Sequence, residues 1–255
     1  MSGIAGLRVK IFADVADIED FKRLSELDLI DGFTTNPTLM RKAGVTDYLG
    51  FIEELLPLTG GRSVSFEVIG DDFDEMERQA LALSGFGDNV FVKIPVTDTR
   101  GNSSCHLISD LSARGVKLNV TAMMSVEQVE RVLPHLAPGV PAIVSIFAGR
   151  IADTGIDPVP IMKRASELLS ESPYAELLWA SPRELLNVFQ ADEAGCDIIT
   201  ILPEIIAKFH RIGQDLGELS LETVKMFYDD AVSSGLTIPG KAREDDERLH
   251  RELPA

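Results

Sequence analysis

The stretch Val90-Phe91-Val92-Lys93-Ile94-Pro95 places one lysine inside an otherwise apolar run. Side chains on a β-strand alternate between its two faces, so Lys93 shares a face with Phe91 and lies opposite Val92 and Ile94. Two positions account for such a lysine: an exposed edge strand, or the interior of a closed barrel. An edge strand would leave the neighbouring residues free to be polar, and they are not. The run therefore favours the interior of a barrel.

The same alternation recurs in other short runs. In the run at 116–121, Asn119 and Thr121 lie opposite Leu118 and Val120. In each such run one face is apolar and the other ends in a polar residue. Further examples of these polar residues are Asp14, Glu67 and Ser145. A closed barrel explains this pattern, because its outer face packs on helices while its inner polar groups converge at the carboxyl ends of the strands. A doubly wound open sheet is the alternative. Its strands should be apolar on both faces, and a glycine-rich turn should follow the first strand, where this chain has Asp-Val-Ala-Asp at 14–17.

Eight strand-like runs alternate with segments of helical periodicity along the chain, at 7–14, 32–35, 63–68, 90–95, 116–121, 142–147, 177–181 and 198–202. Helix starts are indicated by Asn36-Pro37 and by two capping-box patterns, Ser125–Gln128 and Ser181–Glu184. We therefore predict the α/β class, with a single (β/α)8 TIM barrel over residues 1–238. Residues 239–255 are predicted to be a charged C-terminal tail.

Composition limits the partners. The chain has 255 residues, a size typical of one α/β barrel, and a formal net charge of −17. A field of that sign repels nucleic acid and anionic membranes, so neither is expected as a partner. No apolar run is long enough to cross a bilayer, and the first residues lack the pattern of a signal peptide. Cys105 and Cys196 have no paired spacing, which indicates a reducing compartment, and we expect a cytoplasmic protein.

Three ionisable residues at strand ends are candidates for chemistry. Because burying an ammonium group is costly, Lys93 is well placed to act as a neutral amine nucleophile toward a carbonyl. Glu67 is either a catalytic carboxylate or simply the ion-pair partner of that lysine. Asp14 could also cap the following helix. No metal-ligand spacing is present and the four histidines have no partner spacing, so neither a metal nor another cofactor is expected.

Three further residues follow the sixth and seventh runs. Arg150 and Arg183 come directly after predicted strands, where they either face a ligand or are ordinary surface arginines. Ser181 is expected to cap a helix, and a helix N-terminus also binds anions. An anionic ligand would need such local positive potential in a chain this acidic.

At these residues the sequence resembles the transaldolase family, which includes fructose-6-phosphate aldolases. The resemblance covers roughly residues 8–235, and its motifs occur in the family's order. They are Phe12-Ala-Asp14, Gly32-Phe-Thr-Thr-Asn-Pro-Thr38, Val92-Lys-Ile-Pro-Val-Thr97, Asn119-Val-Thr121, Ser145-Ile-Phe-Ala-Gly-Arg150 and Ala180-Ser-Pro-Arg183.

The resemblance implies a role for each matching residue. Lys93 would form a Schiff base with a ketose carbonyl, and Asp14 would exchange the proton of the hydroxyl whose carbon becomes the released aldehyde. Glu67 and Thr121 would hold a proton-carrying water. The three-carbon dihydroxyacetone unit would be bound by Thr34, Asn36, Asn119 and Ser145, and the terminal phosphate by Arg150, Ser181 and Arg183.

Two positions distinguish activities within the family. Position 147 is Phe and position 67 is Glu, where the aldolases that release dihydroxyacetone usually carry Tyr and Gln. Both residues favour transfer of the three-carbon unit, so we predict a transaldolase of carbohydrate metabolism that acts on sugar phosphates. Pro182 departs from the family pattern, in which an aromatic residue is commoner, so another acid-bearing sugar is also a candidate substrate. The alternatives are an aldolase and a catalytically silent sugar-phosphate-binding barrel, and association as a homo-oligomer is left open.

Overall fold

The computed structural model describes residues 6–238. They fall in two compact units, divided between His210 and Arg211. The first contains a closed barrel of parallel strands in the order β1-β2-β3-β4-β5-β6-β7-β8, which confirms the predicted fold class. The strands are β1 (Lys10–Asp14), β2 (Gly32–Thr34), β3 (Ser63–Glu67), β4 (Val90–Pro95), β5 (Leu118–Met123), β6 (Ala142–Ile146), β7 (Ala175–Trp179) and β8 (Ile198–Ile201).

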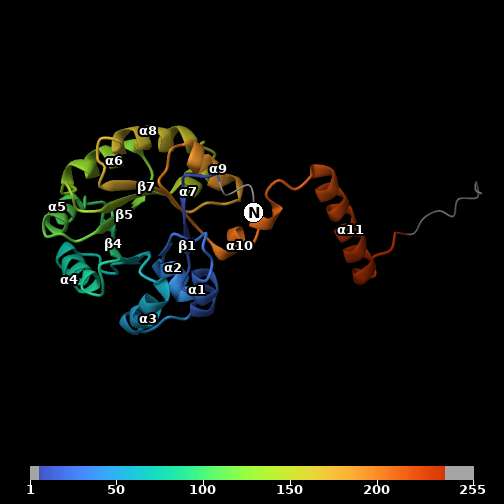
Figure 1. Ribbon diagram of the computed structural model, residues 1–255, viewed down its shortest axis with the longest axis horizontal. Helices are drawn as coiled ribbons and strands as arrows, with labels where there is room; N and C mark the ends of the chain where they lie inside the picture. Colours follow the sequence, from blue (N-terminus) through green and yellow to red (C-terminus); the bar gives the residue numbers. More distant parts are fainter. Residues whose placement is uncertain (1–5, 239–255) are drawn as a thin grey trace, which may run out of the picture. The chain divides into compact units, whose positions relative to one another are not determined.

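Helices follow the strands and form a ring outside them (Figure 1). The helices of this unit are α1 (Ile18–Ser25), α2 (Pro37–Lys42), α3 (Tyr48–Leu55), α4 (Phe73–Ser84), α5 (Cys105–Ala113), α6 (Val126–Val132), α7 (Ala148–Ala152), α8 (Val159–Leu169), α9 (Leu186–Glu193) and α10 (Pro203–Ile206). Two predicted helix starts are confirmed. Asn36 caps α2 with Pro37 at its first position, and Ser125 forms a complete capping box with Gln128 at the start of α6.

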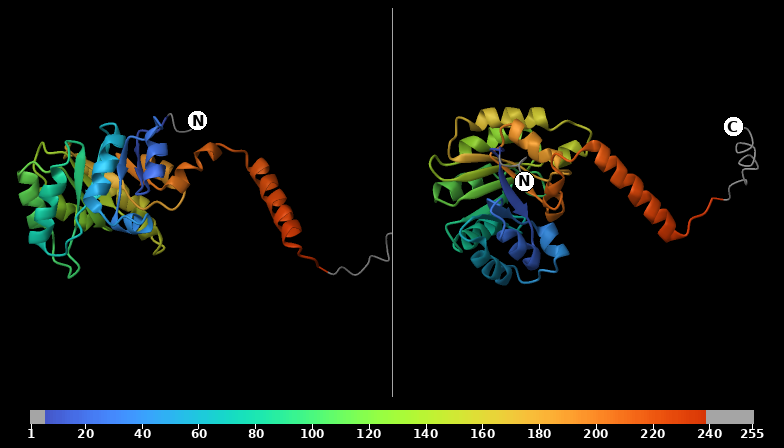
Figure 2. Two further views of the ribbon diagram at one scale, coloured as in Figure 1. Left: turned by 90° about the horizontal axis from the view of Figure 1, so that it is seen from below. Right: turned by 45° about the vertical axis from the view of Figure 1, so that its right-hand side comes forward.

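The second unit contains α11 (Leu216–Ser234), a single uninterrupted helix drawn in orange to red (Figure 2). Asp215 caps it, accepting hydrogen bonds from the main-chain N–H groups of Gly217 and Glu218. The extent of the barrel domain to residue 238 stays a prediction, and the predicted charged tail, 239–255, lies outside the described residues. In the described part of the chain, no helix is both long and apolar enough to cross a membrane.

The alternation read from the sequence separates two layers of side chains. Outward-facing residues such as Ile11, Val92 and Val144 join the main core between the strands and the helices. A smaller apolar cluster fills the lumen with Phe12, Phe91, Ile143, Leu178, Ala180 and Ile198. Gly32 makes room for this cluster, because a Cβ atom there would lie 2.6 Å from the ring of Phe12. The lumen is thus packed, and the polar inward-facing residues lie toward the carboxyl ends of the strands.

Candidate active site

A cavity of about 410 Å³ opens at the carboxyl ends of the strands. Every site residue predicted from the sequence lines it: Asp14, Thr34, Asn36, Glu67, Lys93, Asn119, Thr121, Ser145, Phe147, Arg150, Ser181 and Arg183. Further walls come from the start of α2 and the end of β8, at Pro37, Thr38, Leu39, Thr200 and Leu202. The barrel therefore gathers into one cavity residues that lie as far apart in the chain as Asp14 and Arg183.

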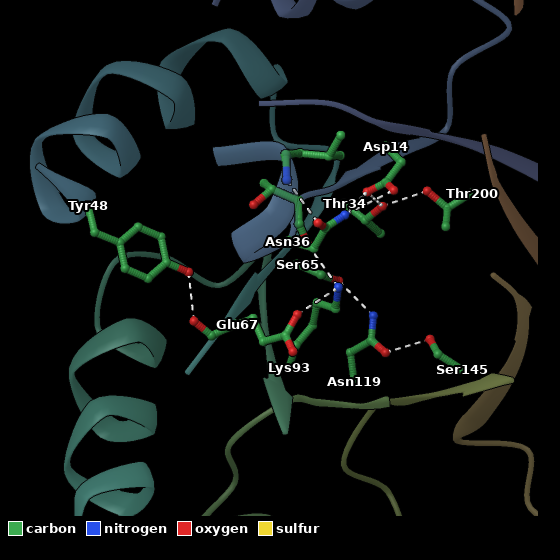
Figure 3. A network of polar contacts seen from close by, with 12 residues as sticks. Asp14, Thr34, Asn36, Tyr48, Ser65, Glu67, Lys93, Asn119, Ser145 and Thr200 are labelled. Carbon is green, nitrogen blue, oxygen red and sulfur yellow. Dashed lines mark hydrogen bonds and ion pairs between the residues drawn. The ribbon is translucent and has the colours of Figure 1, made fainter. Parts of the chain in front are cut away.

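Lys93 projects from β4 into this cavity and is only 6% exposed. Its amine donates a hydrogen bond to the main-chain carbonyl of Thr35, 2.8 Å away, and pairs with Glu67 Oε2 at 3.2 Å (Figure 3). β4 is bonded on both sides, to β3 and to β5, so the edge-strand interpretation of this lysine is wrong. Glu67 is an ion-pair partner of Lys93, as one interpretation of the sequence had it, and it also faces the cavity.

Asp14 ends β1 and is buried in the same network. Thr34 donates a hydrogen bond to Asp14 Oδ1 at 2.8 Å, and the Asn36 amide donates to Oδ2 at 3.2 Å. Burial raises the pKa of the Asp14 carboxyl above its ordinary value, a shift opposed by the nearby charge of Lys93. Asp14 does not cap α1; that cap is Asp17, which accepts from the main-chain N–H of Asp20. A buried carboxyl with a raised pKa is suited to take up and return a proton.

Thr200 is a cavity residue that the sequence analysis missed. Its hydroxyl oxygen lies 2.5 Å from that of Thr34, which in turn donates to Asp14. Because Thr34 has only one hydroxyl proton, Thr200 is the donor of the pair when Thr34 bonds to Asp14. The alternation in Ile198-Ile-Thr200 was the available signal, since Ile198 faces the lumen and Thr200 shares its face.

A second polar chain crosses the lumen from β3 to β6. The Asn119 amide donates to Ser65 Oγ at 3.0 Å, and Ser145 donates to Asn119 Oδ1 at 2.6 Å (Figure 3). All three residues are buried. These two hydrogen bonds orient the amide and leave one of its N–H donors for other partners.

β5 becomes irregular at the level of the site. Its pairing with β6 shifts between Val120 and Met123, and Ala122 adopts a left-handed conformation with φ 62°. Thr121 directly precedes this residue and lines the cavity. Its buried hydroxyl has no hydrogen-bond partner within residues 6–238. Because Thr121 also lines the cavity, its hydroxyl is available to bond a molecule bound there.

Two arginines line the cavity from its α7 and β7 side. The Arg150 guanidinium carbon lies 5.0 Å from the centre of the Phe147 ring. Arg183 is held by Asp153, with Nε 3.0 Å from Oδ1, and its Nη1 donates to the carbonyl and hydroxyl oxygens of Ser181 at 3.0 Å each. Asp153 was not predicted, because an aspartate thirty residues away from its partner carries no local signal.

The expected capping role of Ser181 is wrong. Ser181 adopts a left-handed conformation with φ 61°, and α9 begins only at Leu186, without a side-chain cap. Packing against Gly149 accompanies this turn, since a Cβ atom at position 149 would lie 1.6 Å from the Ser181 carbonyl oxygen. The close approach of α7 to the main chain after β7 brings Arg150 and Ser181 into the same cavity.

Comparison with known proteins identifies related sequences. Residues 11–238 match the model of the family described as transaldolase/fructose-6-phosphate aldolase. The chain is 37% identical over 201 residues to "Probable transaldolase 2" of Listeria monocytogenes, covering 78% of this chain and 88% of the relative. It is 35% identical over 194 residues to "Probable transaldolase" of Dehalococcoides mccartyi, covering 76% and 86%. With "Probable transaldolase" of Hyphomonas neptunium, identity is 34% over 231 residues, covering 90% of this chain and all of the relative.

Solved structures show the same fold at low sequence identity. A mutant flavocytochrome b2 with benzoylformate aligns with a TM-score of 0.53 and 11% identity, over 77% of this chain and 57% of that one. At this identity the likeness concerns the fold alone.

Proposed function

Because the chain belongs to the transaldolase/fructose-6-phosphate aldolase family, we propose that it is a transaldolase that transfers a dihydroxyacetone unit between sugar phosphates. The donor is a ketose phosphate such as fructose 6-phosphate, and the acceptor is an aldose phosphate. The observation that carries the proposal is the buried amine of Lys93 next to Glu67, in one cavity with the buried carboxyl of Asp14. The proposed setting is cytoplasmic carbohydrate metabolism.

The first step in this proposal is Schiff-base formation on Lys93. The Lys93 ammonium gives a proton to Glu67, and the neutral amine adds to the ketose carbonyl. The carbinolamine hydroxyl then takes up that proton and leaves as water, which gives an iminium. Glu67 and Thr121 hold the water that carries protons in this dehydration. Support comes from the 3.2 Å contact between Glu67 and the amine, and from the buried Thr121 hydroxyl that lacks a partner in the described chain.

Carbon–carbon cleavage follows. Asp14 takes the proton from the hydroxyl on the carbon that becomes the aldehyde, the bond breaks, and its electron pair moves into the iminium to give an enamine. The aldose leaves, an acceptor aldehyde enters, and the same steps run in reverse until hydrolysis frees the product ketose and the lysine. The raised pKa of Asp14, caused by its burial, suits a group that both accepts and returns a proton.

The substrate is held at both ends. The hydroxyls of the three-carbon unit bind Thr34, Asn36, Asn119 and Ser145. Hydrogen bonds to Asp14 orient Thr34 and Asn36, and the bond between Ser145 and Asn119 orients those two side chains. The terminal phosphate binds Arg150, Ser181 and Arg183 at the other side of the cavity. Holding the distant phosphate keeps the reacting carbons aligned with Lys93.

The test is reductive trapping. Borohydride added during turnover of fructose 6-phosphate should attach a three-carbon adduct to Lys93, located by mass mapping. Lys93→Met should abolish the adduct, whereas Lys117→Met should not, since Lys117 bonds to the Asp88 carbonyl away from the cavity. An adduct on another lysine would contradict the Schiff-base assignment. Binding of sugar phosphates without any adduct or product would instead favour the silent binding barrel.

A further inference from the structure

The sheet bonding between β2 and β3 stops at the level of Glu67. The last main-chain bond on this side runs from the Thr35 N–H to the Ser65 carbonyl, at 3.2 Å. Donors in a parallel pair recur every second residue, so the next donor on the β2 side would come from position 37, opposite the Glu67 carbonyl. That residue is Pro37, which has no N–H. The Glu67 carbonyl therefore needs a donor from elsewhere.

Tyr48 supplies this donor. Its hydroxyl donates a hydrogen bond to the Glu67 carbonyl oxygen at 2.8 Å (Figure 3). Tyr48 is the first residue of α3, which Asp47 caps by accepting from the Gly50 N–H. Burial raises the pKa of the Tyr48 hydroxyl above its ordinary value, so the group stays protonated and can only donate to a carbonyl.

Glu67, whose carbonyl Tyr48 bonds, is also the residue whose side chain pairs with Lys93. On the β4 side, the Val68 N–H donates to the Lys93 carbonyl at 3.1 Å. Tyr48 holds the other side of the same segment, through the Glu67 carbonyl. The Glu67 side chain, which pairs with the Lys93 amine, thus projects from a main chain anchored on both sides.

We propose that Tyr48 is a positioning residue that holds Glu67 in place for proton transfer at Lys93. Tyr48 does not line the active-site cavity; its ring lines a separate groove with Leu49, Ile69 and Gln79. It therefore acts through Glu67 and not by touching the substrate. The inference rests on the proposed function, because it assigns Glu67 to the dehydration that forms the Schiff base.

Tyr48→Phe in the full chain tests the proposal, since it keeps the ring and removes only the hydroxyl. Losing one such hydrogen bond should slow the single-turnover formation of the borohydride-trapped Lys93 adduct by roughly two- to tenfold. The KM for fructose 6-phosphate should stay within about twofold, because the cavity walls are unchanged. Tyr174→Phe is the matched control: Tyr174 is half-buried just before β7, outside the cavity, and its loss of a hydroxyl should not alter the rate.

A Glu67→Ala background separates positioning from general loosening of the barrel. If Tyr48 acts through Glu67, Tyr48→Phe should slow adduct formation little further in that background. An equal loss in both backgrounds, or no loss in the native background, would overturn the proposal. Absence of any adduct in the wild type would instead overturn the proposed function.

If Tyr48→Phe folds poorly, amide hydrogen exchange of the wild type and Tyr48→Phe at low temperature replaces the rate measurement. Faster exchange confined to residues 66–69 is expected, and unchanged exchange there would count against the anchoring role.

Discussion

Arg183 and Asp153 form an ion pair at the rim of the active-site cavity, with Nε 3.0 Å from Oδ1 and 3.1 Å from Oδ2. Hydrogen bonding from Arg183 lowers the pKa of the Asp153 carboxyl, so the carboxylate stays charged and offsets much of the positive charge of the arginine. Arg150 contacts the face of Phe147, and its charge acts on Asp153 less strongly than that of the hydrogen-bonded Arg183. The two arginines proposed to bind phosphate therefore differ in the charge that each can offer to a ligand.

This difference predicts the order of two substitutions. Arg150→Ala and Arg183→Ala should both lower kcat/KM for a phosphorylated substrate far more than for its unphosphorylated counterpart. The loss should be larger for Arg150→Ala, on the order of 10- to 100-fold, because charge-assisted hydrogen bonds to phosphate are among the strong ones. Arg164→Ala, which removes an exposed partner of Glu167 on α8, is the control. Equal losses with both substrates would show that neither arginine binds the phosphate.

Asp14→Asn should lower kcat by roughly 10²- to 10⁴-fold, the usual contribution of a general acid or base. The same change should raise stability at neutral pH. In the folded chain burial raises the pKa of Asp14 above its unfolded value of 3.8, so ionising this group costs folding free energy. That cost appears as the pH rises from 3.8 through the folded pKa, and it is absent below this window.

Thermal unfolding across pH checks the second part. The midpoint of Asp14→Asn should exceed that of the wild type at pH 8, and the gap should close toward pH 4. Asp28→Asn, at an exposed position in the turn between α1 and β2, should show no such trend. A variant less stable than the wild type at every pH would mean that hydrogen bonding by Asp14 outweighs the cost of burying its charge.

Phe147→Tyr should shift the reaction from transfer toward release of dihydroxyacetone. The enamine on Lys93 either meets an acceptor aldehyde or is protonated and hydrolysed. Phe147 lines the cavity without a hydroxyl, whereas Tyr could hold a water near the intermediate. The measurement is dihydroxyacetone formed per aldehyde released, with and without an acceptor aldose. Stoichiometric release by the wild type, unaffected by acceptor, would make this chain an aldolase.

Gly149→Ala should destabilise the protein by about 1–3 kcal/mol, because the added methyl group would overlap the Ser181 carbonyl and force α7 away from it. Displacing α7 also moves Arg150, so kcat/KM for a phosphorylated substrate should fall as well. Gly85→Ala adds the same methyl group at a helix end where the nearest atom lies 3.3 Å away, and it should be much better tolerated. Denaturant unfolding of both variants provides the comparison, and similar stabilities would show that α7 accommodates the methyl group without cost.

Much of this architecture was determined by local sequence. A period of two residues in each strand separates outward-facing side chains such as Val92 from inward-facing ones such as Lys93, and the barrel keeps that separation. The helix starts at Asn36 and Ser125 could be predicted equally well, because an N-cap side chain bonds to a main-chain N–H only three residues further along. The capping-box pattern at Ser181 failed where a long-range contact, between Ser181 and Gly149, takes precedence over local preference.

The tertiary structure alone decided which groups hydrogen-bond to the predicted site residues. Thr200 reaches Asp14 through Thr34, Asp153 holds Arg183, and Tyr48 replaces a donor that Pro37 lacks. Thr34 and Thr200 are 166 residues apart, Asp153 and Arg183 are 30 apart, and Tyr48 is 19 residues from Glu67, whose carbonyl it bonds. The residues next to them in the sequence do not indicate these pairings. The sequence by itself determined the inward-facing polar set, because alternation along a strand is a local property. The hydrogen-bond partners within that set depend on barrel closure and strand register, which arise only when the distant strands pack together.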